Sequence, residues 1–191
     1  MSCSEKPEMS KHRPRAYLAG PDVFFPNPLK IGEAKKAICA EHGLEGVFPL
    51  DANLDLEGLS PEEQGYRCFD AMVELMESSD LVIANLTPFR GPSMDVGTAV
   101  ELGYMHGRGK PVFGYTNVAE DYADRVAPDG FLIEPFGLVD NLMVEGPIFR
   151  TGARVIRACV PRAEIYTSLE GFTKCVIEAA ASAAKAGRVQ R

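Results

Sequence analysis

A continuous apolar run in the middle of the chain restricts its fold more than any other feature. Residues 81–86 are Leu-Val-Ile-Ala-Asn-Leu, with a single polar side chain among them. Such a run is typical of a central strand in a parallel sheet, because helices cover both faces of that strand. Parallel neighbours need long crossover connections, which are usually helices. The segments on either side should therefore alternate between strand and helix.

The surrounding chain shows this alternation from Arg15 to Phe113. Further strands are predicted at Arg15–Ala19, Gly46–Leu50 and Pro111–Tyr115. Apolar side chains at helical spacing between them predict helices over about 29–41, 60–78 and 96–107. The alternation predicts an α/β fold, a doubly wound parallel sheet with right-handed crossovers.

The predicted helices have recognisable starts and inner faces. Ser60-Pro61-Glu62-Glu63 is a strong helix start, because Ser60 can cap the helix and Glu63 can complete a capping box. The first helix should bury one apolar stripe and the second another. These stripes are Ile31, Ala34 and Ile38, and Phe69, Met72, Val73 and Met76.

The last third of the chain is less regular. It should hold a short acidic helix near 118–126, a loop over 137–143, a fifth strand at Ala163–Tyr166 and a final helix from Ser168 to about Lys185. With no internal repeat or linker, we predict one domain over residues 15–186. A mobile leader (1–14) should precede it and a frayed tail (187–191) should follow it.

Composition limits the class of partner. The chain has 191 residues and a formal net charge of −7, which argues against nucleic acid, since that partner needs clustered Lys and Arg. No run approaches the roughly 18 apolar residues of a membrane span, and the N-terminus lacks the apolar core of a secretory signal. The odd number of cysteines favours buried thiols in a reducing compartment. We therefore expect a cytoplasmic protein that is not bound to membranes.

Common cofactor motifs do not occur. No G-x-G-x-x-G follows the first strand, and Gly109-Lys110 runs into Pro111 instead of completing a P-loop. The three histidines are isolated, and no Cys or His pair has metal-ligand spacing. We expect neither a metal nor an organic cofactor.

Residues 80–104 contain the side chains that most strongly suggest a functional site. Ligands of doubly wound sheets bind outside the carboxyl ends of the strands, and the loop at 87–94 leads there directly into a helix. Asp95 stands at the N-cap position, and Glu101 follows six residues later, about 9 Å along the helix. Gly97, close to Glu101, would let a substrate approach. Ordinary structural roles also fit these residues: Glu101 as a solvated helix residue, Asp95 as a simple cap and Asp80 as a turn residue.

The order of three segments resembles the nucleoside 2-deoxyribosyltransferase family. They are Tyr17-Leu-Ala-Gly20-Pro21, Asp80-Leu-Val-Ile-Ala-Asn-Leu and Asp95-Val-Gly-Thr-Ala-Val-Glu101-Leu-Gly-Tyr. A further segment, Gly137 to Met143, also resembles the family, so the likeness covers about residues 17–143 together with the last strand and helix. The chain differs from compact members by an apparent insertion at about 145–162.

The resemblance implies a flavodoxin-like fold with about five strands and helices on both faces, and a role for each matching residue. Glu101 matches the nucleophile that attacks the anomeric carbon, and Tyr17 matches the tyrosine that orients it. Asp80 matches the aspartate that exchanges a proton with the base. Asp95 matches the aspartate that holds the sugar 5′-hydroxyl. Asn141 matches an asparagine that a partner subunit lends, so a homo-oligomer with shared active sites is implied.

Gly20 and Gly97 fall within the matching segments, and Phe24 lies in the loop after the first strand, where its ring can stack on a base or pack in the core. The partners implied are nucleosides and nucleobases, in nucleotide salvage. A carboxylate under the anomeric carbon suits the oxocarbenium-like state of glycosidic cleavage, and two inversions give retention.

The implied activity is exchange of the base of 2′-deoxynucleosides through a glycosyl intermediate on Glu101. Asp95 favours a free 5′-hydroxyl, because a carboxylate would repel a phosphate. Ser93 and Thr98 at the helix start leave a 5′-monophosphate open. Two different functions fit the same residues: an N-glycosidase that passes the sugar to water, and a non-catalytic nucleotide-sensing module. The range of bases accepted and the oligomer size stay open.

Overall fold

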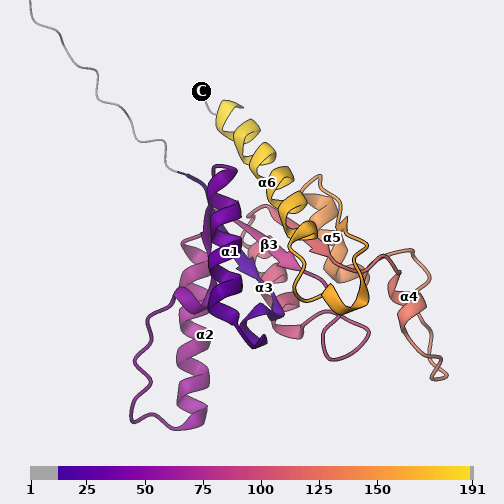
Figure 1. The fold of residues 1–191 in the computed structure, drawn as a ribbon, viewed down its shortest axis with the longest axis horizontal. Coiled ribbons are helices and arrows are strands. Elements are labelled where there is room, and N and C mark those ends of the chain that lie inside the picture. The colour runs from indigo at the N-terminus through magenta and orange to yellow at the C-terminus, as the bar shows by residue number, and fades with distance from the viewer. Residues whose placement is uncertain (1–12, 190–191) are drawn as a thin grey trace, which may run out of the picture.

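The computed structural model describes residues 13–189 and has a five-stranded parallel sheet at its centre (Figure 1). The strand order is β2-β1-β3-β4-β5, and every neighbouring pair is parallel. This order confirms the predicted α/β architecture. The strands are β1 (Arg15–Ala19), β2 (Glu45–Val47), β3 (Leu81–Asn85), β4 (Val112–Thr116) and β5 (Ile156–Arg157).

Helices cover both faces of this sheet. α1 and α6 lie on one face, which is turned toward the viewer in Figure 1, and α3 and α5 pack on the other face. α2 projects beyond the sheet at one side of the molecule. The helices are α1 (Pro28–Glu41), α2 (Pro61–Glu77), α3 (Val96–Gly107), α4 (Tyr122–Arg125), α5 (Leu142–Arg150) and α6 (Glu170–Val189).

The core lies around the two central strands. All five residues of β3 are buried, as the apolar run at 81–86 predicts. The order in which successive strands are added to the sheet reverses between β1 and β3, because β2 lies on one side of β1, whereas β3 and then β4 lie on its other side. The carboxyl ends of β1 and β3 therefore form the switch point where such folds bind ligands.

Side chains from α5 and from the residue that follows β3 pack closely over Gly114 in β4. A Cβ built on Gly114 would lie 2.7 Å from a methyl carbon of Ile148 in α5 and 2.7 Å from one of Leu86. These contacts are far inside ordinary van der Waals separation, so a side chain at this position would force the ends of the Ile148 and Leu86 side chains to move.

The fifth strand is not where we predicted it. The segment predicted as a strand, residues 163–166, overlaps a 3-10 turn at Arg162–Glu164 instead. The observed fifth strand, β5, lies earlier in the chain, at Ile156–Arg157. The segment that resembled an insertion, residues 145–162, thus supplies most of α5 and the edge strand itself. A strand of two residues has no alternation to detect, which explains the error.

Two predicted helix faces also need correction. α1 buries Gly32, Lys35 and Cys39 rather than the stripe through Ile31, Ala34 and Ile38, which is only partly buried. The helix is rotated by about one residue, because Lys35 has a buried ionic partner. In α2, Phe69 is 61% exposed, while Met76 is buried. The predicted capping box at Ser60 and Glu63 is present.

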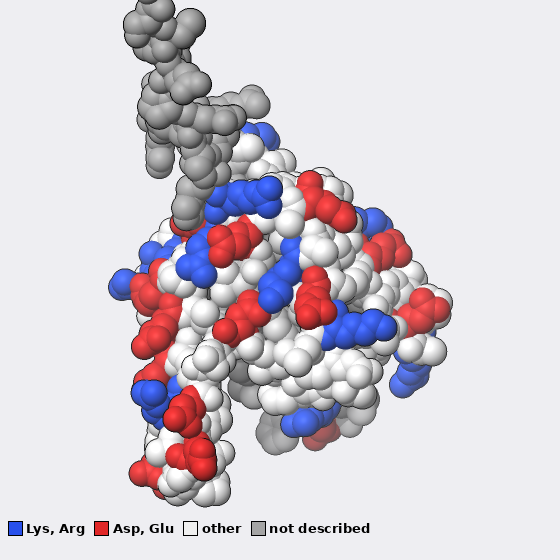
Figure 2. All heavy atoms as spheres, turned by 60° about the vertical axis from the view of Figure 1, so that its left-hand side comes forward, with Lys and Arg blue, Asp and Glu red and all other residues white. Residues whose placement is uncertain are grey.

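The predicted leader and tail lie largely at or beyond the ends of the described chain. Residues 1–12 of the leader and residues 190–191 of the tail lie outside the described residues, and α6 continues through Val189. None of the described helices combines the length and apolar character of a membrane span. On the face drawn in Figure 2, acidic and basic side chains are intermixed.

Candidate active site

The centre of the candidate site is a contact between β1 and α3. The Tyr17 hydroxyl donates a hydrogen bond of 2.5 Å to Glu101 Oε1. Tyr17 is completely buried in the middle of β1, and Glu101 lies two turns into α3. Since both come from regular elements that pack on each other, the carboxylate is held in a defined position.

Asp95 fixes the start of α3. Its Oδ2 accepts hydrogen bonds from the backbone N–H of Thr98 at 2.9 Å and from the Thr98 hydroxyl at 3.0 Å. One residue earlier, the backbone N–H of Met94 donates to the buried Asp140 carboxylate at 2.8 Å. The loop after β3 is therefore tied at its end, and α3 begins at a fixed place. Asp95 is a helix cap, and its other oxygen, Oδ1, makes no hydrogen bond within the described chain.

A cavity of about 620 Å³ opens above this contact. This volume lies within the range of small-molecule sites, roughly 300–1,000 Å³. The loops after β1 and β2, α2 and the start of α3 form its wall. The lining residues are Gly20, Val23, Phe24, Pro49, Leu50, Ala52, Leu54, Leu56, Cys68, Met72, Asp95, Gly97 and Glu101. Most of the wall is apolar, and the two carboxylates lie on the α3 side.

The surroundings raise the pKa of Glu101 to about 7. Burial is the main cause, because it disfavours the charged form, and the negative charge of Asp95 acts in the same direction. The hydrogen bond from Tyr17 opposes both by stabilising the carboxylate. Burial and the neighbouring Glu101 in turn raise the pKa of Tyr17, which stays a neutral donor. A carboxylate poised near neutral pH in a cavity is a functional-site candidate.

Three further residues selected from the sequence line the same cavity. Gly20 directly follows β1, Gly97 lies in the first turn of α3, and Phe24 is 56% exposed at the wall. Phe24 stacks on Phe89 with ring centroids 5.7 Å apart and an interplanar angle of 12°. The Arg90 guanidinium lies over both rings, 5.3 Å and 4.9 Å from their centroids. The Phe24 ring is therefore held in place on its Phe89 side.

The structure does not bring Asp80 to this site. Its carboxylate accepts the backbone N–H of Arg15 at 2.7 Å, at the amino edge of the sheet. The cavity opens at the carboxyl edge, and β3 separates the two edges by roughly 13 Å at 3.3 Å per residue. The structure therefore places Asp80 at the opposite edge of the sheet from this cavity, out of reach of a base bound there. Asp80 instead links the starts of β1 and β3.

Asn141 likewise lies away from the cavity of its own chain. It caps α5, because its side-chain oxygen accepts the N–H of Met143 at 2.9 Å, and its amide donates to Glu134 at 3.0 Å. Its side chain is exposed.

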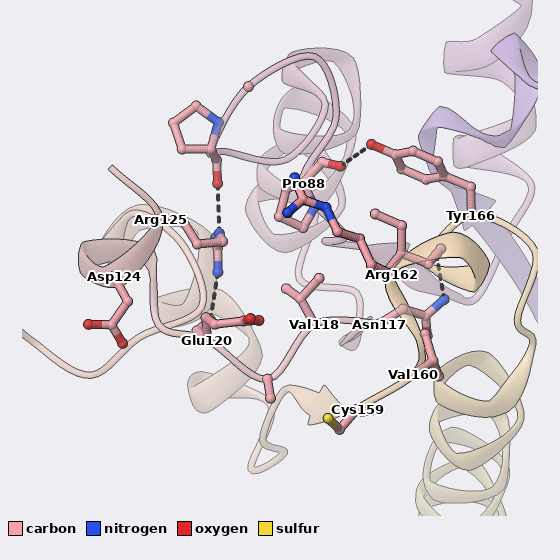
Figure 3. A pocket seen from close by; sticks show the side chains of 14 residues that line it. Pro88, Asn117, Val118, Glu120, Asp124, Arg125, Cys159, Val160, Arg162 and Tyr166 are labelled. Atoms are coloured by element: carbon pink, nitrogen blue, oxygen red, sulfur yellow. Dashed lines mark hydrogen bonds between the residues drawn. The ribbon is translucent and has the colours of Figure 1, made fainter. Parts of the chain in front are cut away.

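A second cavity, of about 600 Å³, lies beyond the loop that follows β3 (Figure 3). Its polar groups mainly bond loop backbone. Arg125 donates to the carbonyls of Pro92, Glu120 and Val139, and the Tyr166 hydroxyl donates to the Pro88 carbonyl at 2.8 Å. These contacts hold loops together, so we place the chemistry in the Glu101 cavity.

Sequence reasoning missed part of the site. Cys68 and Met72 line the cavity one turn apart on α2, where they were expected to be a buried thiol and core packing. The apolar loop after β2 could have been found from the rule that ligands bind beyond the carboxyl ends of strands. Within residues 13–189, no group of three His, Cys, Asp or Glu side chains is arranged to hold a metal ion.

The chain is similar in sequence to known proteins. A family model for nucleoside 2-deoxyribosyltransferases matches residues 16–143. An uncharacterized protein of Schizosaccharomyces pombe is 33% identical over 177 residues, which covers 78% of this chain and 84% of that protein.

Two solved structures resemble the fold. One is described as a 2-desoxiribosyltransferase from Leishmania mexicana, with a TM-score of 0.58 and 27% identity, covering 69% of this chain and 85% of that one. The other is a conserved protein from Enterococcus faecalis, with a TM-score of 0.55 and 20% identity, covering 88% of this chain and 99% of that one. At that identity the second similarity concerns the fold alone.

Proposed function

The chain belongs to the nucleoside 2-deoxyribosyltransferase family, and from that premise we propose that it exchanges the base of 2′-deoxynucleosides through a covalent intermediate on Glu101. The observation that carries this proposal is the 2.5 Å hydrogen bond from Tyr17 to Glu101 beside a cavity of nucleoside size. A positioned carboxylate with one oxygen held by a phenol leaves its second oxygen for attack.

In the first step, Glu101 Oε2 forms a bond to the anomeric carbon as the glycosidic bond breaks. The bonding electron pair leaves with the base nitrogen, and the base takes a proton. Water supplies that proton in this proposal, since Glu101 and Asp95 are the only carboxyl groups of the described chain in the cavity wall. A deoxy sugar eases the step, because it lacks an electron-withdrawing 2′-hydroxyl.

In the second step, a nitrogen of the incoming base attacks the same carbon from the opposite side. The ester bond to Glu101 breaks, its electron pair returns to the carboxylate, and the new base loses a proton to water. Two inversions give net retention at the anomeric centre. Neither step uses a metal or an organic cofactor.

The remaining residues bind the substrate in this proposal. Asp95 accepts a hydrogen bond from a free 5′-hydroxyl through Oδ1. Gly97 and Gly20 allow close approach of the sugar, and Phe24 stacks on the base. Asn141 reaches the cavity of a neighbouring subunit, so the active form is a homo-oligomer. We place this activity in nucleotide salvage in the cytoplasm.

Product analysis tests the proposal. The enzyme is incubated with 2′-deoxyinosine and adenine, and the products are separated chromatographically. We expect 2′-deoxyadenosine and hypoxanthine from the wild type, and neither from Glu101→Gln. Free deoxyribose without exchange would make the protein a hydrolase. No cleavage of this substrate, of thymidine or of a deoxynucleoside 5′-monophosphate would contradict a catalytic role altogether.

A trapping experiment tests the covalent step separately. A nucleoside with a fluorine at C2′ destabilises the oxocarbenium-like states, so breakdown of the intermediate slows. We expect the intact protein to gain the mass of the fluorinated sugar, and peptide mapping to locate it on Glu101. A productive exchange with no adduct on Glu101 would contradict the assignment of the nucleophile.

A further inference from the structure

A buried ion pair lies directly behind the cavity wall that follows β1. Lys35 Nζ is 2.7 Å from Asp22 Oδ2, and the two side chains are 2% and 4% exposed. Lys35 comes from α1, and Asp22 belongs to η1, the 3-10 turn Pro21–Phe24. Neither residue lines the cavity, and neither has a part in the chemistry proposed above.

The lysine is fully partnered. Its ammonium group donates to the Tyr115 hydroxyl at 2.9 Å and lies 5.0 Å from the centroid of the Phe172 ring. Tyr115 belongs to β4 and Phe172 to α6, so the lysine joins α1 to both elements.

The aspartate reaches two further parts of the switch point. The Asn85 side-chain amide, at the end of β3, donates to Asp22 Oδ2 at 3.4 Å. A Cβ on Gly20 would lie 2.3 Å from the same oxygen, so the carboxylate occupies space that only a glycine leaves free. Asp22 thereby ties the turn after β1 to the end of β3.

This network costs free energy that an apolar contact would not. Two buried charges must lose their hydration, and replacing such a pair with apolar side chains is often neutral or stabilising. Stability alone therefore does not explain it. What the pair does fix is the position of a turn whose neighbouring residues, Gly20, Val23 and Phe24, all line the cavity.

The geometry points to Asp22 and Lys35 as positioning residues that hold the Gly20–Phe24 wall in the shape that binds a nucleoside. This inference rests on the proposed function. If the turn is released, Phe24 loses its fixed relation to Glu101 and substrate binds less well, while the Tyr17–Glu101 contact, which β1 and α3 hold, stays intact.

Steady-state kinetics on three variants test the inference. Lys35→Met leaves a buried charge unpaired, and we expect the KM for 2′-deoxyinosine to rise about tenfold or more, with kcat changed by less than about threefold. Val176→Ala is the matched control, because it removes buried volume from α6 and lowers the melting temperature without touching the turn. Its KM should stay at the wild-type value. Lys174→Met, which removes an exposed ion pair, should change neither quantity.

The double variant Asp22→Asn/Lys35→Met separates positioning from stability. It holds no unpaired charge, so the melting temperature should recover relative to Lys35→Met, while the KM stays raised. Recovery of both would mean that the pair acts on stability alone, and would overturn the inference. If the wild type turns over 2′-deoxyinosine, an unchanged KM in both Lys35→Met and the double variant would also overturn the inference.

Amide hydrogen exchange gives a second answer that does not depend on turnover. In Lys35→Met we expect faster exchange in the peptide covering residues 18–27 than in the wild type, with α3 unchanged. Equal exchange in that peptide would overturn the inference. If the wild type cleaves no nucleoside, the proposed function is wrong. The amide hydrogen exchange result would then decide alone whether the ion pair holds the turn.

Discussion

Removing one hydroxyl group offers a direct test of the Glu101 environment. In Tyr17→Phe the carboxylate loses the hydrogen bond that stabilises its charged form. A hydrogen bond to a charged group is worth about 1.5–3 kcal/mol, and 1.36 kcal/mol corresponds to one pKa unit. The pKa of Glu101, about 7 in the wild type, should therefore rise by about one to two units.

The consequence for activity follows from the ionised fraction. A nucleophilic carboxylate must be charged, so kcat/KM should rise with pH through the pKa of Glu101 and level off above it. At pH 7 about half of the wild-type molecules carry the charge, and about 1–10% of the variant should. We expect a loss of about 5- to 50-fold at pH 7 that shrinks as the pH approaches 9.

The assay is the pH dependence of kcat/KM for base exchange, measured for both proteins between pH 5 and about pH 9.5. The rising limb of the variant should lie at higher pH than that of the wild type. A limb at an unchanged or lower pH would refute the argument, because the hydroxyl would then not be stabilising the charge of Glu101. A uniform loss at every pH would instead assign Tyr17 to orientation alone.

Three other substitutions give independent tests. The pKa of Glu101 is about 7 in the folded protein, against an ordinary value of 4.5. The folded wild type therefore binds an extra proton in this range and loses stability as the pH rises from about 4.5 to 7. Glu101→Gln should escape that loss, so in thermal unfolding it should be more stable than the wild type by about 3 kcal/mol at pH 8 but not at pH 4. Asp95→Ser should raise kcat/KM for deoxynucleoside 5′-monophosphates relative to kcat/KM for free deoxynucleosides by about tenfold or more, equivalent to about 1.4 kcal/mol. If competition assays show an unchanged ratio, Asp95 does not bind the 5′ position. Asp80→Asn should keep exchange activity within about twofold while lowering stability by up to about 1 kcal/mol; a large loss of kcat in a folded variant would reinstate Asp80 as a proton donor.

The regular parts of this fold could be predicted from the sequence because each has a local cause. The run at 81–86 has the composition of a covered strand, and Ser60 with Glu63 fixes the start of α2 through bonds between near neighbours. β5 could not be predicted, since two residues carry no pattern and only the pairing with Tyr115 and Thr116 makes them a strand.

The site was predicted unevenly for a similar reason. Tyr17 and Glu101 followed from the family resemblance, and the structure brings them together. Asp80 was misplaced because a motif gives the order of residues along the chain, not the edge of the sheet that each one faces. The rotation of α1 depends on Lys35 meeting Asp22, thirteen positions earlier in the chain, and no helical periodicity contains that information.

The division of the cavity between rigid and variable parts affects how such an enzyme can diversify. Glu101 and Tyr17 lie on a helix and a strand. Phe24, in contrast, belongs to an aromatic group that reaches Phe89 and, through Phe25, Tyr166 near the carboxyl-terminal helix. Insertions or deletions in residues 145–166 can thus alter the rim from a distance. Under the proposed function, descendants of this chain can come to accept new bases while Tyr17 and Glu101 are inherited unchanged.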